Sequence, residues 1–391
     1  MLTLFVTSED LFSLTININN LNKKTMKKLL LFAAAAVAFG ASAQTLTQMW
    51  KNEDVKKFAV WDTRQGVGMN GKVYINVGAE KKVYVVDEKG ISATTLPGTA
   101  NTTINRDQAG NLIVSTPVFP TPFGEADNFL VYNPQTPDKI TTLEIPTDML
   151  TVGRIDYTGL AKGNLTADGE LMLIGNKGTG IYKLVVMDGA TSKDDSYIAT
   201  CEGANITNNM TVINTFKDGD VDKYLYVTRN AKPAIIVEDG DNYKIEKELT
   251  LENKGACNGA EIFTLGGKKY IVYPTLPNYL DGFAIACIDG EFEGAIPAVA
   301  VHKEELTGDN PNGGQANWLN AEVVSDNEAI IHQFIPGAYA AAYSFKLPAE
   351  QTGINDVNAA KDVKVRKVYE NGQVYIIKGD VKYNVMGAQV K

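Results

Sequence analysis

The side chains with the most chemical potential are polar residues that stand where the apolar runs of successive repeats begin. They are Arg64, Arg106, Arg154, Asp156, Asn209, Asn258, Glu261 and Asn317. If these residues converge, they could fix a polar ligand. They could also serve an enzyme of the lyase or lactonase type, with or without a metal. The alternative is that they bond backbone groups and water.

Aromatic residues form a second candidate set, in two stretches that proline residues stiffen. Phe119 and Phe123 lie in the stretch 117–125, and Tyr273 and Tyr279 lie in the stretch 273–281. Trp318 and Phe334 are placed where they could join these rings. Aromatic side chains cost little entropy to order, so they suit the binding of sugars or peptides. The alternative is that the rings pack on one another and hold long loops in place.

Motifs for catalysis and metal binding are weak. His302 and His332 are the two histidines, and neither lies in a nucleophile or metal motif. A Gly-x-Ser-x-Gly sequence, the usual cue for serine hydrolysis, does not occur. The aspartates at 218, 220 and 222 alternate as in a calcium loop, but the downstream Gly and Glu are missing. We therefore expect no catalytic residue, no cofactor and no bound metal, with calcium as the one candidate ion.

A repeated spacing of turns and apolar runs indicates the elements that position these residues. The intervals Gly71 to Val83, Gly169 to Ile181 and Asn327 to Tyr339 are all 12 residues long. Six copies of the pattern lie about 51 residues apart on average. A period near 50 filled with short strands is typical of a β-propeller, with one four-stranded blade per repeat. The sequence therefore predicts an all-β, six-bladed β-propeller, with a pair of β-sandwiches as the alternative.

Each blade is expected to run from an inner strand A through B and C to an outer strand D. The inner strand of blade one is predicted at 58–61. Blade six lacks an outer strand of its own, so we expect the segment 45–50 to supply it and close the ring. The A–B and C–D turns then share one face, here called the turn face. The B–C and D–A links share the other, here called the loop face.

The loop face is the expected binding face, because binding residues concentrate on loops that a rigid scaffold holds. The enlarged B–C links belong to blades two and five, which lie opposite each other in a ring of six. Their aromatic residues would therefore overhang the central opening from two sides.

The ends of the chain carry export signals. Residues 26–43 have two lysines, an apolar core and a small-residue cleavage site, which is typical of a signal peptide. Residues 1–25 are interpreted as an over-extended start before the true initiator, Met26. The propeller is assigned to 44–349, a linker to 350–356 and a small C-terminal β-module to 357–391. We expect a protein exported through the periplasm to the outer cell surface or the medium, with no membrane span.

The net charge limits the classes of partner, and the cysteine count limits the possible disulfides. The chain has 37 Lys+Arg against 46 Asp+Glu, a net charge of −9, which argues against nucleic acid or anionic lipid as a partner. Three cysteines remain after export, at 201, 257 and 287. Cys257 and Cys287 could pair, or the cysteines could be small buried hydrophobic residues.

The C-terminal sequence resembles a known family of export signals. The segment from Tyr383 to Lys391, with Gly353-Ile354 upstream, is similar to the C-terminal sorting domains of type IX secretion cargo. This resemblance implies export across the outer membrane, the secretion machinery as a partner and possible removal of the tail. The body resembles secreted bacterial six-bladed β-propellers of uncharacterised activity. We therefore expect a non-catalytic propeller that binds a glycan or a protein at its loop face.

Overall fold

The computed structural model describes residues 44–92, 96–100, 103–115, 128–146, 157–174, 180–203, 211–228, 231–255, 259–275, 282–303, 316–348, 365–370, 373–378, 381–384 and 389–390. The chain divides into two compact units, Met1–Leu347 and Pro348–Lys391. The first unit is the propeller and the second is the C-terminal module.

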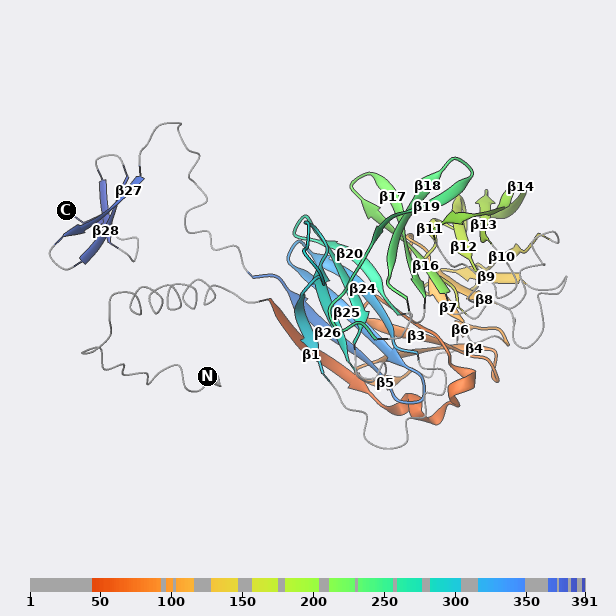
Figure 1. Ribbon diagram of the computed structural model, residues 1–391. Coiled ribbons are helices and arrows are strands. Elements are labelled where there is room, and N and C mark those ends of the chain that lie inside the picture. Colours follow the sequence, from red (N-terminus) through yellow and green to blue (C-terminus); the bar gives the residue numbers. More distant parts are fainter. Residues whose placement is uncertain are drawn as a thin grey trace. The chain divides into compact units, whose positions relative to one another are not determined.

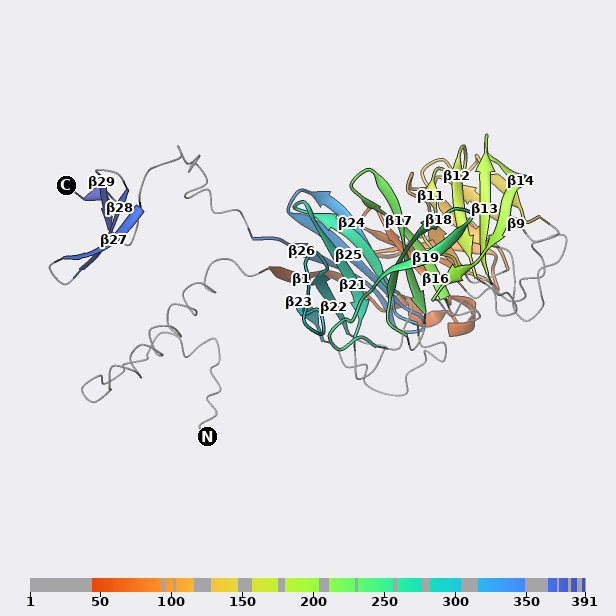
Figure 2. The ribbon, with the colours of Figure 1, turned by 45° about the horizontal axis from the view of Figure 1, so that its top comes forward.

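Six antiparallel sheets surround a common axis in the first unit, so the predicted six-bladed β-propeller is confirmed (Figures 1 and 2). From the inside outwards, blade one contains β2 (Gly66–Met69), β3 (Lys72–Val77), β4 (Lys82–Asp87) and β5 (Gly90–Ile91). Blade two contains β7 (Ile104–Arg106), β8 (Leu112–Ser115), β9 (Asn128–Tyr132) and β10 (Thr141–Glu144). Blade three contains β11 (Lys162–Gly163), β12 (Gly169–Leu173), β13 (Ile181–Met187) and β14 (Ala190–Ala199). The short strand β6 (Leu96–Pro97) also pairs with β4.

The remaining three blades follow the same order. Blade four contains β16 (Thr211–Asp218), β17 (Val221–Thr228), β18 (Ala234–Asp239) and β19 (Asn242–Glu248). Blade five contains β20 (Glu261–Leu265), β21 (Lys268–Pro274), β22 (Phe283–Cys287) and β23 (Ala298–His302). Blade six contains β24 (Trp318–Ser325), β25 (Glu328–Ile335), β26 (Tyr339–Lys346) and β1 (Thr45–Asn52). The short strand β15 (Cys201–Glu202) runs parallel to β19 at the outer edge of blade four.

Strand β1 closes the ring, as the sequence predicts. It pairs antiparallel with β26, with Thr45 opposite Lys346 and Asn52 opposite Ala340. Leu46 packs against the core between blades five and six, and Trp50 packs against the core next to blade one. The first strand of the propeller therefore completes the last blade, which removes the free edge of β26.

The hydrophobic core consists of six clusters, and each lies between two successive blades. Blades one and two share a cluster around Val67 and Leu112, and blades two and three share one around Ile113 and Leu184. The other clusters join blades three and four, four and five, and five and six. The sixth joins blade six to blade one and includes Trp318. Because every blade is buried against both neighbours, the ring is the unit that buries the apolar strand faces.

The inner strand of blade one differs from its prediction. The segment Val60–Asp62 is a short 3-10 helix, η3, preceded by η2 (Asp54–Lys57), and the inner strand is β2. The reason is close packing at the axis: a Cβ atom on Gly68 would lie 2.1 Å from Cβ of His332. The glycine-rich sequence of β2 has a low strand propensity, but it alone fits this crowded position.

Tight hairpins join the strands on the turn face. Asn70 and Gly71 have φ angles of 55° and 69°, and Asp188 and Gly189 have φ angles of 50° and 73°. Positive φ at both central residues is the geometry that Asn-Gly and Asp-Gly pairs favour in two-residue hairpins. The Asn-Gly and Asp-Gly pairs of the repeat therefore adopt the tight-turn conformation that these residue types favour.

The C-terminal module is a four-stranded sheet. Its strands follow in the order β27 (Val365–Glu370), β28 (Gln373–Lys378), β29 (Val381–Asn384) and β30 (Gln389–Val390), all antiparallel. The three expected strands are present, and β30 adds a fourth within the segment that resembles a sorting signal.

Two of the three cysteines lie in the described residues, and both are free thiols. Cys201 is buried, and burial raises the pKa of its thiol to about 11. Cys287 is half-buried in β22. Cys257 lies outside the described residues, so its pairing with Cys287 stays a prediction.

Candidate functional site

An exposed tryptophan beside an arginine marks the loop face near the axis. Trp61 lies in η3 and keeps 59% of its surface exposed, whereas Arg64, three residues later, keeps 7%. Cζ of Arg64 lies 5.6 Å from the ring centroid of Trp61 and 5.3 Å from that of Tyr157. Nη2 of Arg64 also donates to the Tyr157 hydroxyl at 3.2 Å. The guanidinium is therefore held between two rings, one of which is open to solvent.

The buried rings beneath Arg64 fix its position. Nε1 of Trp318 donates to the Arg64 carbonyl at 2.7 Å, and its ring meets Tyr157 edge-on with centroids 4.7 Å apart. Phe334 belongs to the same buried cluster and lies under Gly66. Trp318 and Phe334, both predicted ligand-binding residues, thus support the surface residues from below.

Tyr273, a further predicted binding residue, is also inside the protein. Its side chain is fully buried, and its hydroxyl donates to the Glu252 carbonyl at 2.9 Å. This contact ties the end of β21 to the segment before blade five. The other predicted residues, Phe119, Phe123, Tyr279, Arg154, Asp156 and Asn258, lie outside the described residues, and their placement at the loop face stays a prediction.

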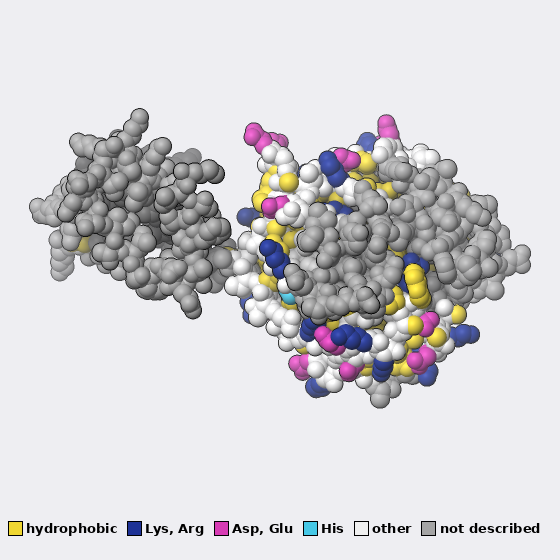
Figure 3. All heavy atoms as spheres, turned by 60° about the horizontal axis from the view of Figure 1, so that its bottom comes forward, with side chains coloured by type: hydrophobic (Ala, Val, Ile, Leu, Met, Phe, Trp, Pro, Cys, Tyr) yellow, Lys and Arg dark blue, Asp and Glu magenta, His cyan; other side chains and the backbone are white. Residues whose placement is uncertain are grey.

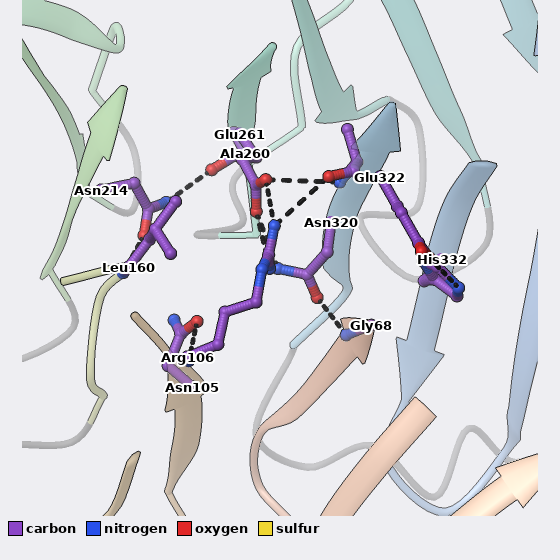
Figure 4. Close-up of polar contacts among 11 residues, drawn as sticks. Gly68, Asn105, Arg106, Leu160, Asn214, Ala260, Glu261, Asn320, Glu322 and His332 are labelled. Carbon is purple, nitrogen blue, oxygen red and sulfur yellow. Dashed lines mark hydrogen bonds and ion pairs between the residues drawn. The ribbon is translucent and has the colours of Figure 1, made fainter. Parts of the chain in front are cut away.

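A belt of polar contacts joins the inner strands around the axis (Figure 4). Asn214 donates to the Ala260 carbonyl and accepts from the Leu160 N–H, both at 2.8 Å. Asn320 accepts from the Gly68 N–H and donates to Glu261, both at 2.9 Å. The belt continues through the Ala161 N–H, which donates to the Arg106 carbonyl at 3.1 Å, and the Ala161 carbonyl, which accepts from the Gln108 N–H at 3.2 Å. The sequence analysis missed Asn214 and Asn320, although each follows an apolar pair early in an inner strand.

Arg106 and Glu261 meet across the axis, from blades two and five. Nη2 of Arg106 lies 2.7 Å from Oε1 of Glu261 and also donates to the Ala321 carbonyl at 3.2 Å. Glu261 is 4% exposed. A charged pair this buried is tolerated because each partner neutralises the other and further hydrogen bonds complete the pair. Two of the residues proposed for an enzyme site are thus engaged with each other.

Asn317, the last described residue of the polar set, also bonds protein groups, whereas Asn209 lies outside the described residues. Its amide donates to the Gly282 carbonyl at 3.2 Å and accepts from Gln333 at 3.0 Å. Gln333 in turn accepts from the hydroxyls of Tyr339 and Tyr343. This buried network holds the start of β22, just after the enlarged link of blade five.

The two histidines occupy different surroundings. His332 is buried beside Gly68, and burial, followed by the positive charge of Arg106, lowers its pKa to about 3, so the ring is neutral at neutral pH. Its Nε2 lies 3.7 Å from Oε2 of Glu322, and among the described residues neither ring nitrogen has a hydrogen-bond partner. His302 contacts the Tyr343 hydroxyl at 3.1 Å and packs on Phe283.

The aspartates of the candidate calcium loop face lysines. Asp218 lies 2.9 Å from Lys223 and 2.8 Å from Lys269, and Asp222 lies 2.9 Å from Lys217. Hydrogen bonds from Lys269 and then Lys223 lower the pKa of Asp218. Within the part of the chain that the structure describes, no group of three or more His, Cys, Asp or Glu side chains could hold a metal. Asp218 and Asp222 are thus engaged in ion pairs with lysines of the β16–β17 hairpin and of β21.

A cavity opens on the turn face, opposite the face that the sequence favours. Its volume is about 830 Å³, and its walls include Asn70, Arg106, Gln108, Lys217 and Glu322. These residues come from turns and strand ends of blades one, two, four and six. The propeller therefore offers two distinct polar regions at the two ends of its axis.

Comparisons with known proteins find folds but no family. No protein-family model matches the chain, and no curated protein matches its sequence. A solved neuraminidase-like protein of A/little yellow-shouldered bat/Guatemala is 9% identical with a TM-score of 0.46, over 77% of this chain and 98% of that one. BBS1N, solved in complex with ARL6DN, is 11% identical with a TM-score of 0.38, over 71% of this chain and 75% of that one. The N-terminal domain of Nup159 is 9% identical with a TM-score of 0.36, over 78% and 96%.

No described helix is long and apolar enough to cross a membrane.

Proposed function

We propose that the chain is an exported, non-catalytic binding propeller that recognises a glycan or a protein with its loop face. The observation that carries this proposal is the exposed Trp61 ring beside the ordered guanidinium of Arg64. Export rests on the signal-like segment 26–43 and on the C-terminal resemblance to sorting domains, which would engage the secretion machinery.

Physical chemistry supports a binding role for this pair. Trp61, with 59% of its surface exposed, leaves a large apolar area in contact with water, and a partner can bury this area. Trp and Arg are among the residues that contribute most to protein interfaces, and an indole ring also stacks on the apolar face of a sugar. Because Tyr157 and Trp318 already hold Arg64, little entropy remains to be lost when a ligand binds.

The described surface of the propeller suits recognition of an uncharged or mixed partner surface. Hydrophobic side chains lie there among acidic and basic ones (Figure 3). The enlarged, aromatic links of blades two and five are expected at the same face, and we propose that Phe119, Phe123 and Tyr279 extend the contact area around Trp61.

Glycan and peptide arrays test the proposal with the mature protein, residues 44–391. Trp61→Ala should weaken binding to the array ligand by about tenfold or more, which corresponds to about 1.4 kcal/mol. Met49→Ala is the matched control, because Met49 is also an exposed large apolar residue, at 52%, but lies on β1 away from this pair. Equal binding by Trp61→Ala and the wild type would remove Trp61 from the site. A joint Phe123→Ala and Tyr279→Ala variant then shows whether the aromatic links bind instead.

A further inference from the structure

We propose that the cavity on the turn face is a second binding site, for a small aliphatic ligand that carries a primary ammonium group. This site is separate from the loop face, and nothing in the proposed function requires it. The size of the cavity, the pairing of its charges and the apolar part of its wall support this assignment.

The cavity has the size of a small-molecule site. Its volume of about 830 Å³ falls within the roughly 300–1,000 Å³ that such sites usually have. Its walls come from the inner strands and turns that surround the axis, including Met69, Leu160 and Val323. These elements belong to the rigid ring, so the cavity is held in shape by the core clusters between blades.

The two cations in the wall are already paired with acids. Arg106 contacts Glu261 at 2.7 Å, and Lys217 contacts Asp222 at 2.9 Å. An anionic ligand would have to compete with these carboxylates. The wall therefore discourages phosphates, sulfates and carboxylates.

One of the two acids in the wall is also engaged. Asp107 accepts hydrogen bonds from the Asn111 N–H at 2.9 Å, the Asn111 amide at 2.8 Å and the Leu165 N–H at 2.9 Å. It is fully buried and completes the turn after β7. This carboxylate stabilises the wall and has little capacity left for a ligand.

Glu322 is the acid in the wall that, within the described part of the chain, has no ion pair with a lysine or an arginine. Its Oε2 accepts from the Gly71 N–H at 2.9 Å, which holds the carboxylate in place. The basic group in contact with it is His332, whose Nε2 lies 3.7 Å from Oε2 and whose ring is neutral, so it contributes no positive charge. Among the described residues Oε1 has no hydrogen-bond partner, and the side chain is partly exposed. A ligand cation would therefore gain a charge-assisted hydrogen bond here.

The rest of the wall matches an alkyl ammonium. Asn133 and Gln135 add uncharged amide groups to the wall, and neither introduces a positive charge that would repel a cation. Met69, Leu160 and Val323 offer apolar surface to the methylene chain. The ligand class thus includes alkyl amines and lysine-like side chains.

Three ligands with the same chain length test this assignment on the full mature protein. Pentylamine is the probe, pentanol is its neutral match and pentanoate is its anionic match, each titrated at constant ionic strength by NMR. Pentylamine should give saturable shifts, and pentanol and pentanoate should bind at least about tenfold more weakly. Glu322→Gln should also weaken pentylamine about tenfold, while its amide oxygen still accepts from the Gly71 N–H.

Matched variants separate a specific site from general attraction to an acidic protein. Asp194→Asn removes one negative charge at an exposed position outside the cavity and should keep wild-type binding. Gln135→Trp, on an exposed turn, should block the cavity without disturbing the core, so it carries the test if Glu322→Gln does not fold. Trp61→Ala should leave pentylamine binding unchanged, whatever it does to the loop face. The proposal is overturned if pentanol or pentanoate binds as well as pentylamine, or if Glu322→Gln and Asp194→Asn have equal effects.

Discussion

At the scale of single residues, the axis of the propeller is organised by paired polar groups. Arg106 and Glu261 neutralise each other at 2.7 Å, and Asn214 and Asn320 connect neighbouring inner strands. These bonds satisfy backbone and side-chain groups that would otherwise be buried without partners, at a cost of roughly 1–3 kcal/mol each. Of the polar set that the sequence identifies, the described residues Arg106, Glu261 and Asn317 therefore hold the ring together.

Burial of His332 predicts a pH-dependent stability. Its pKa is about 3 in the folded protein, against about 6.5 in an unfolded chain. On acidification the unfolded chain takes up this proton first, so the free energy of unfolding should fall as pH drops from about 6.5 towards 3. His332→Leu lacks this group and should show a shallower fall, measured by urea unfolding across that range.

The comparison of these two proteins also controls for packing. Near pH 8 His332 is neutral in both the folded and the unfolded protein. A difference in unfolding free energy between wild type and His332→Leu at that pH therefore reports only how well leucine fits beside Gly68. Equal slopes for wild type and His332→Leu between about pH 6.5 and pH 3 would show that the imidazole is hydrated or protonated in the folded protein.

At the scale of elements, the sequence predicted those strands in which apolar and polar residues alternate, or in which apolar residues are continuous, between two clear turns. The B and C strands of every blade fall where apolar runs such as Val83–Val86 and Tyr270–Tyr273 follow a turn. Ring closure by β1 was predictable, because blade six lacked an outer strand and the segment 45–50 had no other blade. The inner strands were harder to predict from the sequence. Glycine and asparagine at the axis allow close packing and form hydrogen bonds, and strand propensities do not include these effects.

The same limit explains what the sequence missed at the candidate site. Trp61 stands in an apolar run, 58–61, that has the composition of a buried strand, yet it lies in η3 and is exposed. Trp318 and Tyr273 look like binding residues in sequence but are buried, because their positions relative to the core depend on contacts with other blades. The cavity on the turn face combines residues of blades one, two, four and six, so no local pattern could indicate it.

Closure of the ring by β1 gives a prediction at this scale. A joint Leu46→Ser and Trp50→Ala variant removes the apolar contacts of β1 with two core clusters and should lower the free energy of unfolding by about 2–4 kcal/mol. Met49→Ser, on the exposed side of the same strand, should change it by less than about 0.5 kcal/mol. Urea unfolding monitored by tryptophan fluorescence measures both. If the joint variant were as stable as the wild type, β1 would not be what secures blade six.

At the scale of the whole molecule, the two ends of the axis offer different chemistry. The loop face presents an exposed indole and a held guanidinium, whereas the turn face has a cavity whose charges are mostly paired. A rigid ring with clusters between all neighbouring blades can present both without a conformational change. The net charge of −9 makes the chain as a whole repel polyanions.

The most direct test of the central claim is hydrogen–deuterium exchange of the mature protein, with and without the ligand found on the arrays. Binding at the loop face predicts slower exchange in the peptides that contain Trp61, Arg64 and Tyr157, with the turn-face segments 68–71 and 106–110 unchanged. Protection confined to the turn face, or unchanged exchange at Trp61 and Arg64 when the ligand is saturating, would contradict the account.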